Sequence, residues 1–93
     1  MPYSTVRRVL SHEYPKYRKH LKALDRDSKT LRFANPLTDE VIDQLCDKWE
    51  ADHEHNILFC IENDDLDFIA VAHIAINEKH EMELAFSVLK GYQ

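Results

Sequence analysis

The sequence predicts an α+β domain with the element order β-α-α-β-β-β, in which a mostly antiparallel sheet carries two helices on one face. Two segments repeat apolar residues at helical spacing, and the C-terminal part holds three strand-length apolar segments separated by short turns. The chain has 93 residues, one glycine and three prolines. We therefore expect a single domain over residues 1–93, with no linker, repeat or low-complexity stretch.

The N-terminal elements are predicted to be a short strand and an amphipathic helix. Residues Tyr3 to Leu10 alternate two sets of side chains and include β-branched residues, which is typical of a strand. Pro15 suits the first turn of a helix, and we expect this helix to end near Asp25. Its apolar residues recur every three or four positions, at Tyr14, Tyr17, Leu21 and Leu24.

The second helix is predicted from Thr38 to about Asp52. The segment from Arg32 to Pro36 interrupts the helical pattern, because the residue before a proline avoids helical geometry. The Thr38 hydroxyl can cap the next helix, and two acidic residues follow it near the positive end of the helix dipole. One face of this helix is apolar, with Val41, Ile42, Leu45, Cys46 and Trp49.

Three strands are predicted in the remainder of the chain. They run from Ile57 to Glu62, from Asp67 to Ile76 and from Met82 to Leu89. Asn63-Asp64-Asp65 and Asn77-Glu78-Lys79-His80 separate them with residues that stabilise turns. Because both connections are short, we expect an antiparallel meander.

This element order resembles the N-terminal part of the GNAT N-acetyltransferases, and three segments carry the resemblance. Leu31-Arg32-Phe33 before Pro36-Leu37-Thr38-Asp39-Glu40 resembles the entry into the family's second helix. Phe68-Ile69-Ala70-Val71-Ala72-His73 resembles its third strand. Met82 to Gln93 resembles the strand and turn that lead into the acetyl-CoA pyrophosphate loop, with Gln93 as the first residue of that loop. The resemblance implies an acyl-CoA N-acyltransferase fold that stops before the loop.

The resemblance also implies a set of site residues, with acetyl-CoA as cosubstrate and an amine as acceptor. A glutamate at the position of Glu83 acts as general base, often through a water molecule; the alternative is a polar residue at a strand end. The main chain of the following residues binds the thioester oxygen and the pantetheine arm; the alternative is an ordinary core strand. The predicted coenzyme-binding residues are Phe86, Ser87, Val88, Leu89 and Gln93.

Two functions follow from these expectations. The pyrophosphate loop and its helix would come after Gln93, so we expect this polypeptide to bind acetyl-CoA poorly and to be inactive alone. The alternative is a non-catalytic interaction domain with a GNAT-derived half-fold. In that case we expect a homodimer, joined through the last strand or the uncovered face of the sheet. The acceptor amine is not evident from the sequence.

The net charge of −5 is unevenly distributed along the chain. Residues 1–32 hold nine basic and three acidic side chains, whereas residues 33–93 hold three basic and fourteen acidic ones. The basic group could attract phosphate, or it could be a solvated helix face that helps solubility or meets an acidic surface of a partner. No aromatic-interleaved RNA motif accompanies it, so nucleic-acid binding is not expected. The group comprises Arg7, Arg8, Lys16, Arg18, Lys19, Lys22, Arg26, Lys29 and Arg32.

Cysteines and histidines suggest no further chemistry. Cys46 and Cys60 lie inside apolar patterns, which indicates buried free thiols. His53-Glu54-His55 lacks a third ligand, so no metal site is expected. His73 shares a strand face with apolar residues and is either a hydrogen-bonded core residue or a wall of the substrate cleft.

Nucleophilic catalysis and membrane insertion have no support in the sequence. Ser87 and Cys60 have no evident histidine and aspartate partners. The N-terminus lacks a signal-peptide pattern, and no apolar run is long enough to span a bilayer. We therefore expect a cytoplasmic protein.

Overall fold

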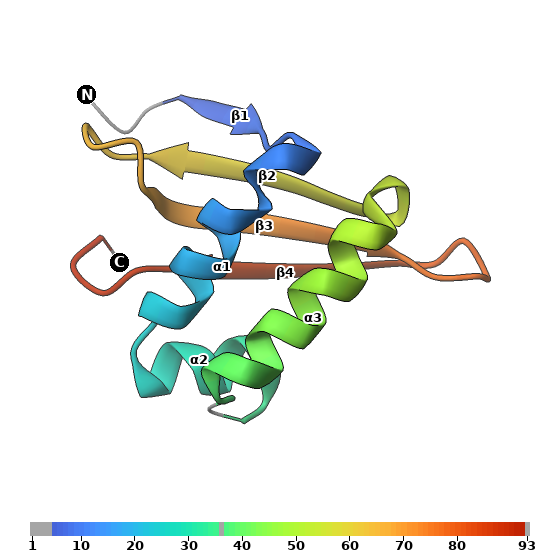
Figure 1. The fold of residues 1–93 in the computed structure, drawn as a ribbon, viewed down its shortest axis with the longest axis horizontal. Coiled ribbons are helices and arrows are strands. Elements are labelled where there is room, and N and C mark those ends of the chain that lie inside the picture. The colour runs from blue at the N-terminus through green and yellow to red at the C-terminus, as the bar shows by residue number, and fades with distance from the viewer. Residues whose placement is uncertain (1–4, 36, 93) are drawn as a thin grey trace.

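The computed structural model describes residues 5–35 and 37–92, and it has an α+β architecture (Figure 1). Its strands are β1 (Val6–Arg8), β2 (Asn56–Glu62), β3 (Phe68–Ile76) and β4 (Met82–Val88). They form one sheet in the order β1-β2-β3-β4, and every neighbouring pair is antiparallel. The predicted fold class and the predicted meander are confirmed.

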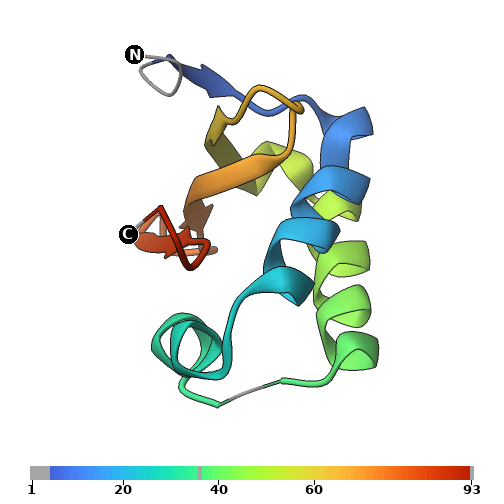
Figure 2. The same ribbon diagram turned by 90° about the vertical axis from the view of Figure 1, so that its left-hand side faces the viewer.

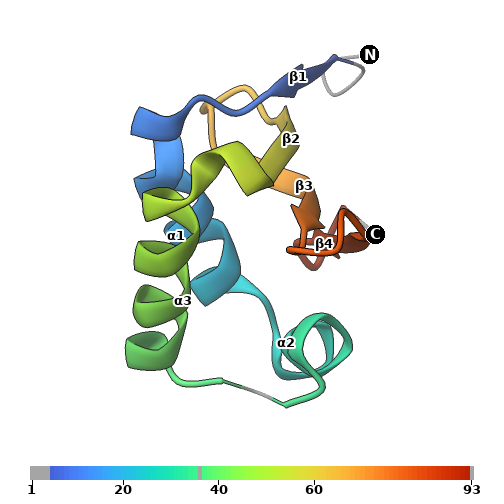
Figure 3. The ribbon, with the colours of Figure 1, turned by 90° about the vertical axis from the view of Figure 1, so that its right-hand side faces the viewer.

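Helices cover one face of this sheet. They are α1 (Tyr14–Ala23), α2 (Arg26–Phe33) and α3 (Asp39–Ala51), with short 3-10 turns η1 (Ser11–Glu13) and η2 (His53–His55). Figures 2 and 3 show α1 and α3 side by side over the sheet, while α2 lies lower, close to β4. Within the described ranges, no helix is long and apolar enough to cross a bilayer.

Helix α2 corrects the prediction that the chain has two helices and that the first ends near Asp25. Helix α1 ends at Ala23, and Asp25 then caps a separate helix by accepting a hydrogen bond from the Ser28 N–H at 2.8 Å. This helix ends at Phe33, because Ala34 adopts a left-handed conformation with φ of 66°. Periodicity missed α2 because it has too few apolar residues to form a stripe.

The first strand is shorter than predicted. The N–H of Val9 still donates to the Leu58 carbonyl at 2.9 Å, but the chain then turns into η1 and leaves the sheet. Tyr3 and Ser4, which belong to the predicted strand, lie outside the described residues.

Side chains from both layers form one core between the helices and the sheet. Tyr17, Leu21, Ile42 and Cys46 are fully buried where α1 meets α3. Cys46 and Cys60 are buried free thiols, as predicted, and burial raises the pKa of each to about 11. The buried core residues are Val9, Tyr14, Tyr17, Leu21, Leu24, Ile42, Cys46, Leu58, Cys60, Phe68 and Val71.

Equivalent asparagine turns connect the last three strands. The Asn63 side-chain oxygen accepts from the N–H groups of Asp65 and Asp67, at 2.9 and 3.0 Å. Asn77 does the same for Lys79 and Glu81, at 2.8 and 3.0 Å. These side chains replace main-chain acceptors in the turn, which explains the predicted turn positions.

The basic N-terminal segment lies against acidic residues of the same chain. Arg18 forms ion pairs with Asp43, Asp47 and Glu50 of α3, which joins α1 to α3. Part of the basic group is therefore paired with carboxylates of the same chain, while its attraction of phosphate or of an acidic partner stays a prediction. The other basic residues with ion pairs are Arg7, Lys16, Lys19 and Lys22.

The opposite face of the sheet, which we call the open face, carries no helix among the described residues. Side chains alternate along each strand, so this face holds the residues between those that enter the core. Met82, Leu84 and Phe86 are 72, 58 and 66 % exposed. Besides Arg8, the open face consists of Val6, Ile57, Phe59, Ile61, Ala70, Ala72, Ile74, Ile76, Met82, Leu84, Phe86 and Val88.

Candidate active site

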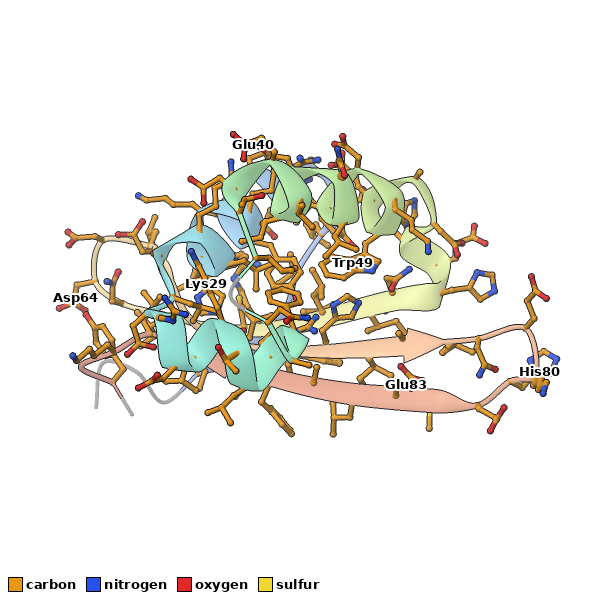
Figure 4. The ribbon with its side chains drawn as sticks, turned by 90° about the horizontal axis from the view of Figure 1, so that it is seen from below. Lys29, Glu40, Trp49, Asp64, His80 and Glu83 are labelled. Carbon is orange, nitrogen blue, oxygen red and sulfur yellow. The ribbon has the colours of Figure 1, made fainter. Side chains whose placement is uncertain are left out.

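A cavity of about 270 Å³ lies where α2 and α3 meet the inner face of β3 and β4. Figure 4 shows Trp49 reaching down from α3 and Glu83 on β4 beneath it. Cavities of this size are at the small end of those that hold small molecules. The lining residues are Arg32, Trp49, His73, Ala75, Glu83, Leu84 and Ala85.

The register of β3 and β4 explains why these residues come together. Glu83 pairs with Ala75, and Ala85 pairs with His73, so all four side chains lie on the helix side of the sheet. Trp49 lies above them on α3, and both alanines leave space that a larger side chain would fill. The cavity therefore exists because the small residues Ala75 and Ala85 lie beside Glu83 and His73 on the inner face of the sheet.

His73 is buried, and both of its ring nitrogens are hydrogen-bonded. The Asn56 amide group donates to the Asp52 carbonyl at 3.0 Å, so Asn56 Oδ1 is left to accept from His73 Nε2 at 2.9 Å. His73 Nδ1 is then an acceptor, with Tyr17 Oη and Arg32 Nη2 each at 3.0 Å. Arg32 Nη2 also donates to Tyr17 Oη, at 3.1 Å. His73 is thus both a hydrogen-bonded core residue and a wall of the cavity.

In this network neither His73 nor Tyr17 is suited to take up or release a proton near neutral pH. Burial, with a contribution from Arg32, lowers the pKa of His73 to about 4. Burial also raises the pKa of Tyr17 to about 12, although Arg32 opposes this shift. Glu83 is the carboxylate that lines the cavity, and it is the lining group best suited to accept a proton from a substrate.

A second and larger cavity, of about 530 Å³, adjoins the first and shares Trp49, Ala75 and Glu83 with it. More carboxylates than basic groups line its wall, which favours a cationic ligand. Glu83 lies at the junction of the two cavities. The other charged lining residues of the second cavity are Lys48, Asp52, His55 and Glu78.

The predicted coenzyme residues follow Glu83 along β4 and its end, but they do not line the Glu83 cavity. The side chains of Phe86 and Val88 belong to the open face, Ser87 is buried on the inner face, and Leu89 packs against the core. Gln93 lies outside the described residues. Coenzyme binding by these residues stays a prediction.

The main-chain N–H and C=O groups of the predicted coenzyme-binding residues point in different directions along β4. The Leu89 N–H donates to the Ile69 carbonyl of β3 at 2.9 Å. In an antiparallel ladder such residues alternate, so Ser87 also directs its main-chain groups toward β3. The main-chain groups of Phe86 then point to the outer edge of β4, where an extended ligand could bind.

Ser87 has a histidine partner that the sequence did not reveal. Ser87 Oγ lies 2.8 Å from His20 Nε2, and His20 Nδ1 donates to the Phe68 carbonyl at 2.7 Å. That carbonyl leaves Nε2 as an acceptor, so the serine hydroxyl donates to it. Both side chains are buried, and burial lowers the pKa of His20. The pair joins α1 to β4 as part of the core.

Arg32 and Trp49 are the cavity residues whose roles sequence reasoning missed. Arg32 counted only as one of nine basic residues, and Trp49 only as part of an apolar helix face. One signal was available for Arg32, because no acidic residue lies three or four positions from it on either side.

No metal site is found in the part of the chain that the structure describes, because no three His, Cys, Asp or Glu side chains there are placed to hold a metal ion.

Comparison with solved structures shows a GNAT-like fold. The crystal structure of the GNAT domain of S. lividans PAT matches 95 % of this chain with a TM-score of 0.66 and 19 % sequence identity. This chain spans 55 % of that one. No protein-family model and no curated protein matches the sequence. The likeness is therefore one of fold.

Proposed function

We propose that this chain forms the acceptor side of a GNAT-type N-acetyltransferase site, which transfers an acetyl group from acetyl-CoA to an amine. The observation that carries the proposal is the position of Glu83 on the inner face of edge strand β4, at the junction of two cavities. The GNAT-like fold supports it, because the matched structure is a GNAT domain.

The proposed reaction uses Glu83 as the base. Its carboxylate takes a proton from the ammonium group of the acceptor, directly or through a water molecule. The freed nitrogen lone pair attacks the thioester carbonyl carbon and forms the C–N bond, while the carbonyl π electrons move to oxygen. When the carbonyl re-forms, the C–S bond breaks and the thiolate leaves with its electron pair. The nitrogen releases its second proton to solvent, and the proton held by Glu83 returns to the thiolate through solvent, which gives a neutral amide, a thiol and one released proton.

In this proposal the main chain of β4 faces the thioester. The main-chain groups of Phe86 point to the outer edge of this strand, where an extended ligand such as the pantetheine arm can bind.

A short thioester tests the proposal without requiring nucleotide binding. We expect the chain to accelerate acetyl transfer from S-acetyl-N-acetylcysteamine to an amine, with a rate that rises linearly with thioester concentration. Glu83→Gln should lower this acceleration by about 100-fold, because the base is lost. Product formation is measured by mass spectrometry.

The matched control is Glu40→Gln. Glu40 is exposed at the start of α3, on the side of the molecule away from Glu83 (Figure 4), so this variant should keep the wild-type rate. Equal rates for the wild type and Glu83→Gln would remove Glu83 as the base.

A second candidate function is a non-catalytic domain that self-associates. The open face favours it, because twelve apolar side chains and a single arginine form its surface. Soluble monomers rarely expose apolar patches larger than a few hundred Å². We propose a second copy of the chain as the occupant, since two such faces are apolar enough to pack without charge repulsion, and edge strand β4 lies beside the patch.

A further inference from the structure

Arg32 has a feature that proton transfer by Glu83 does not explain. Its guanidinium group lies near the faces of two aromatic rings, with Cζ 4.7 Å from the centre of Phe33 and 5.4 Å from the centre of Trp49. Nη2 donates to the uncharged groups of Tyr17 and His73. Nε is buried and has no hydrogen-bond partner among the described residues.

The charge of Arg32 also has no counterpart. Within residues 5–35 and 37–92, no carboxylate lies within ion-pair distance of this guanidinium group, whereas Arg7 and Arg18 each form ion pairs with carboxylates. Holding a half-buried cation and an unsatisfied donor costs stability unless something pairs with them. Both N–H groups of Nη2 are donated to Tyr17 and His73, whereas Nη1 is neither buried nor hydrogen-bonded among the described residues, so a carboxylate can reach the guanidinium group at Nη1.

Arg32 and Glu83 line the same cavity, and they carry opposite charges without forming an ion pair with each other. Such an arrangement matches a ligand that has both charges itself. The cavity volume of about 270 Å³ suits a molecule of amino-acid size rather than a large one. A carboxylate suits Arg32 better than a phosphate does, because Glu83 repels a doubly charged anion and no second cation lines the cavity.

We propose that this cavity binds a small amino-carboxylate, with its carboxylate group on Arg32 and its ammonium group beside Glu83. This inference rests on the proposed function, since it names the class of acceptor whose amine Glu83 would deprotonate. It gives Arg32 the role of positioning the acceptor. The neutral His73 and Tyr17 hold Arg32 in place without competing for the carboxylate.

Trp49 provides a direct measurement of this binding, because it is the single tryptophan of the chain, it lines the cavity and its ring centre lies 5.4 Å from Arg32 Cζ. We expect 4-aminobutyrate, or its shorter and longer homologues, to change the tryptophan fluorescence with saturation in the millimolar range. Butylamine and butyrate, which each lack one charge, should bind at least about tenfold more weakly. The chain length of the homologue that binds best reports the distance between the carboxylate position at Arg32 and the ammonium position at Glu83.

Substitutions then assign each subsite. Arg32→Gln should weaken binding of the amino acid by about tenfold or more, whereas Arg26→Gln, which changes an exposed arginine on the same helix, should not. Glu83→Gln leaves the core untouched and should reduce affinity for the amino acid to that for butyrate. If Arg32→Gln fails to fold, as circular dichroism would show, the Glu83→Gln result alone decides.

Several outcomes would overturn the inference. They are the absence of saturation for every homologue, equal binding of butyrate and the amino acid to the wild type, and equal losses in Arg32→Gln and Arg26→Gln. Because the titration contains no thioester, it is independent of acetyl transfer. Binding without transfer would remove the proposed function and leave this site; transfer to simple amines without binding of amino acids would do the reverse.

Discussion

His73 shows how a single residue connects the core to the cavity. Its ring receives hydrogen bonds at Nδ1 and donates one at Nε2, so adding a proton would place an N–H group against the donors of Arg32 and Tyr17. Trp49 packs edge-on against the same ring, with centroids 4.6 Å apart. The neutral imidazole therefore stabilises the wall of the cavity only while it stays neutral.

This dependence predicts that acid destabilises the fold well above the range in which carboxylates titrate. The pKa of His73 is about 4 when folded, against 6.5 for the free side chain, so the unfolded chain binds a proton first. Stability is therefore complete above about pH 6.5 and falls as the pH approaches 4, by about 3 kcal/mol from this residue. Urea unfolding measured between pH 7 and 4 checks it.

Two variants separate His73 from other titrating groups. His73→Gln should be less stable at pH 7 and should show a smaller decline between pH 6.5 and 4, with the remainder coming in part from His20. His12→Gln, which removes an exposed histidine, should keep the full decline. Burial lowers the pKa of His20, as it does that of His73. Asp52 raises the pKa of the exposed His55, so His55 has the opposite effect on stability in acid. An identical pH profile for His73→Gln and the wild type would contradict this assignment.

Among the elements, α1 and α3 stabilise the fold and α2 completes the cavity. Helix α1 packs its apolar side against α3 and β3, and Arg18 pairs with three carboxylates of α3. Helix α2 contributes only Ser28 to the fully buried set, and it contacts β4 next to the cavity. Its importance lies in Arg32 and Phe33, which it places beside Trp49.

Leucine substitutions on these two helices should differ sharply. Leu21 is fully buried on α1, so Leu21→Ala should lower the free energy of unfolding by about 2–5 kcal/mol, because it removes apolar contacts and leaves a void. Leu31 on α2 is 89 % exposed, so Leu31→Ala should change stability by less than about 0.5 kcal/mol. Equal effects in urea unfolding would mean that the helices pack differently.

The whole molecule is asymmetric, with one covered and one open sheet face. A groove of about 180 Å³ runs across the open face between Val6, Phe59 and Phe86. A chain of this length buries a limited share of its surface, so covering this face would add substantially to its stability. The described residues place no element of the chain over it.

Self-association through the open face can be measured directly. We expect sedimentation at tens of micromolar to show a dimer, and Phe86→Glu to shift it to monomer, because the carboxylate would be desolvated in the interface. Leu31→Ala, on the helix side, should leave the dimer intact. A wild-type monomer at these concentrations would count against the interaction-domain function and would leave the proposed enzyme function unaffected.

Local patterns were sufficient for most of the elements. The apolar segments of β3 and β4, the cap at Thr38 and the turn residues Asn63 and Asn77 each act within a few residues, and each prediction from them is confirmed. Helix α2 was missed because its stability comes from a cap and from contacts with β4 rather than from its own apolar stripe.

The sequence by itself determined the α+β class, the antiparallel meander and the strand on which Glu83 lies. Only the tertiary structure decided that Glu83 shares a cavity with Arg32, Trp49 and His73. The physical reason is distance along the chain: Arg32 and His73 are 41 positions apart, and His20 and Ser87 are 67 apart. Periodicity describes one element at a time, whereas a cavity depends on how side chains from four elements pack together.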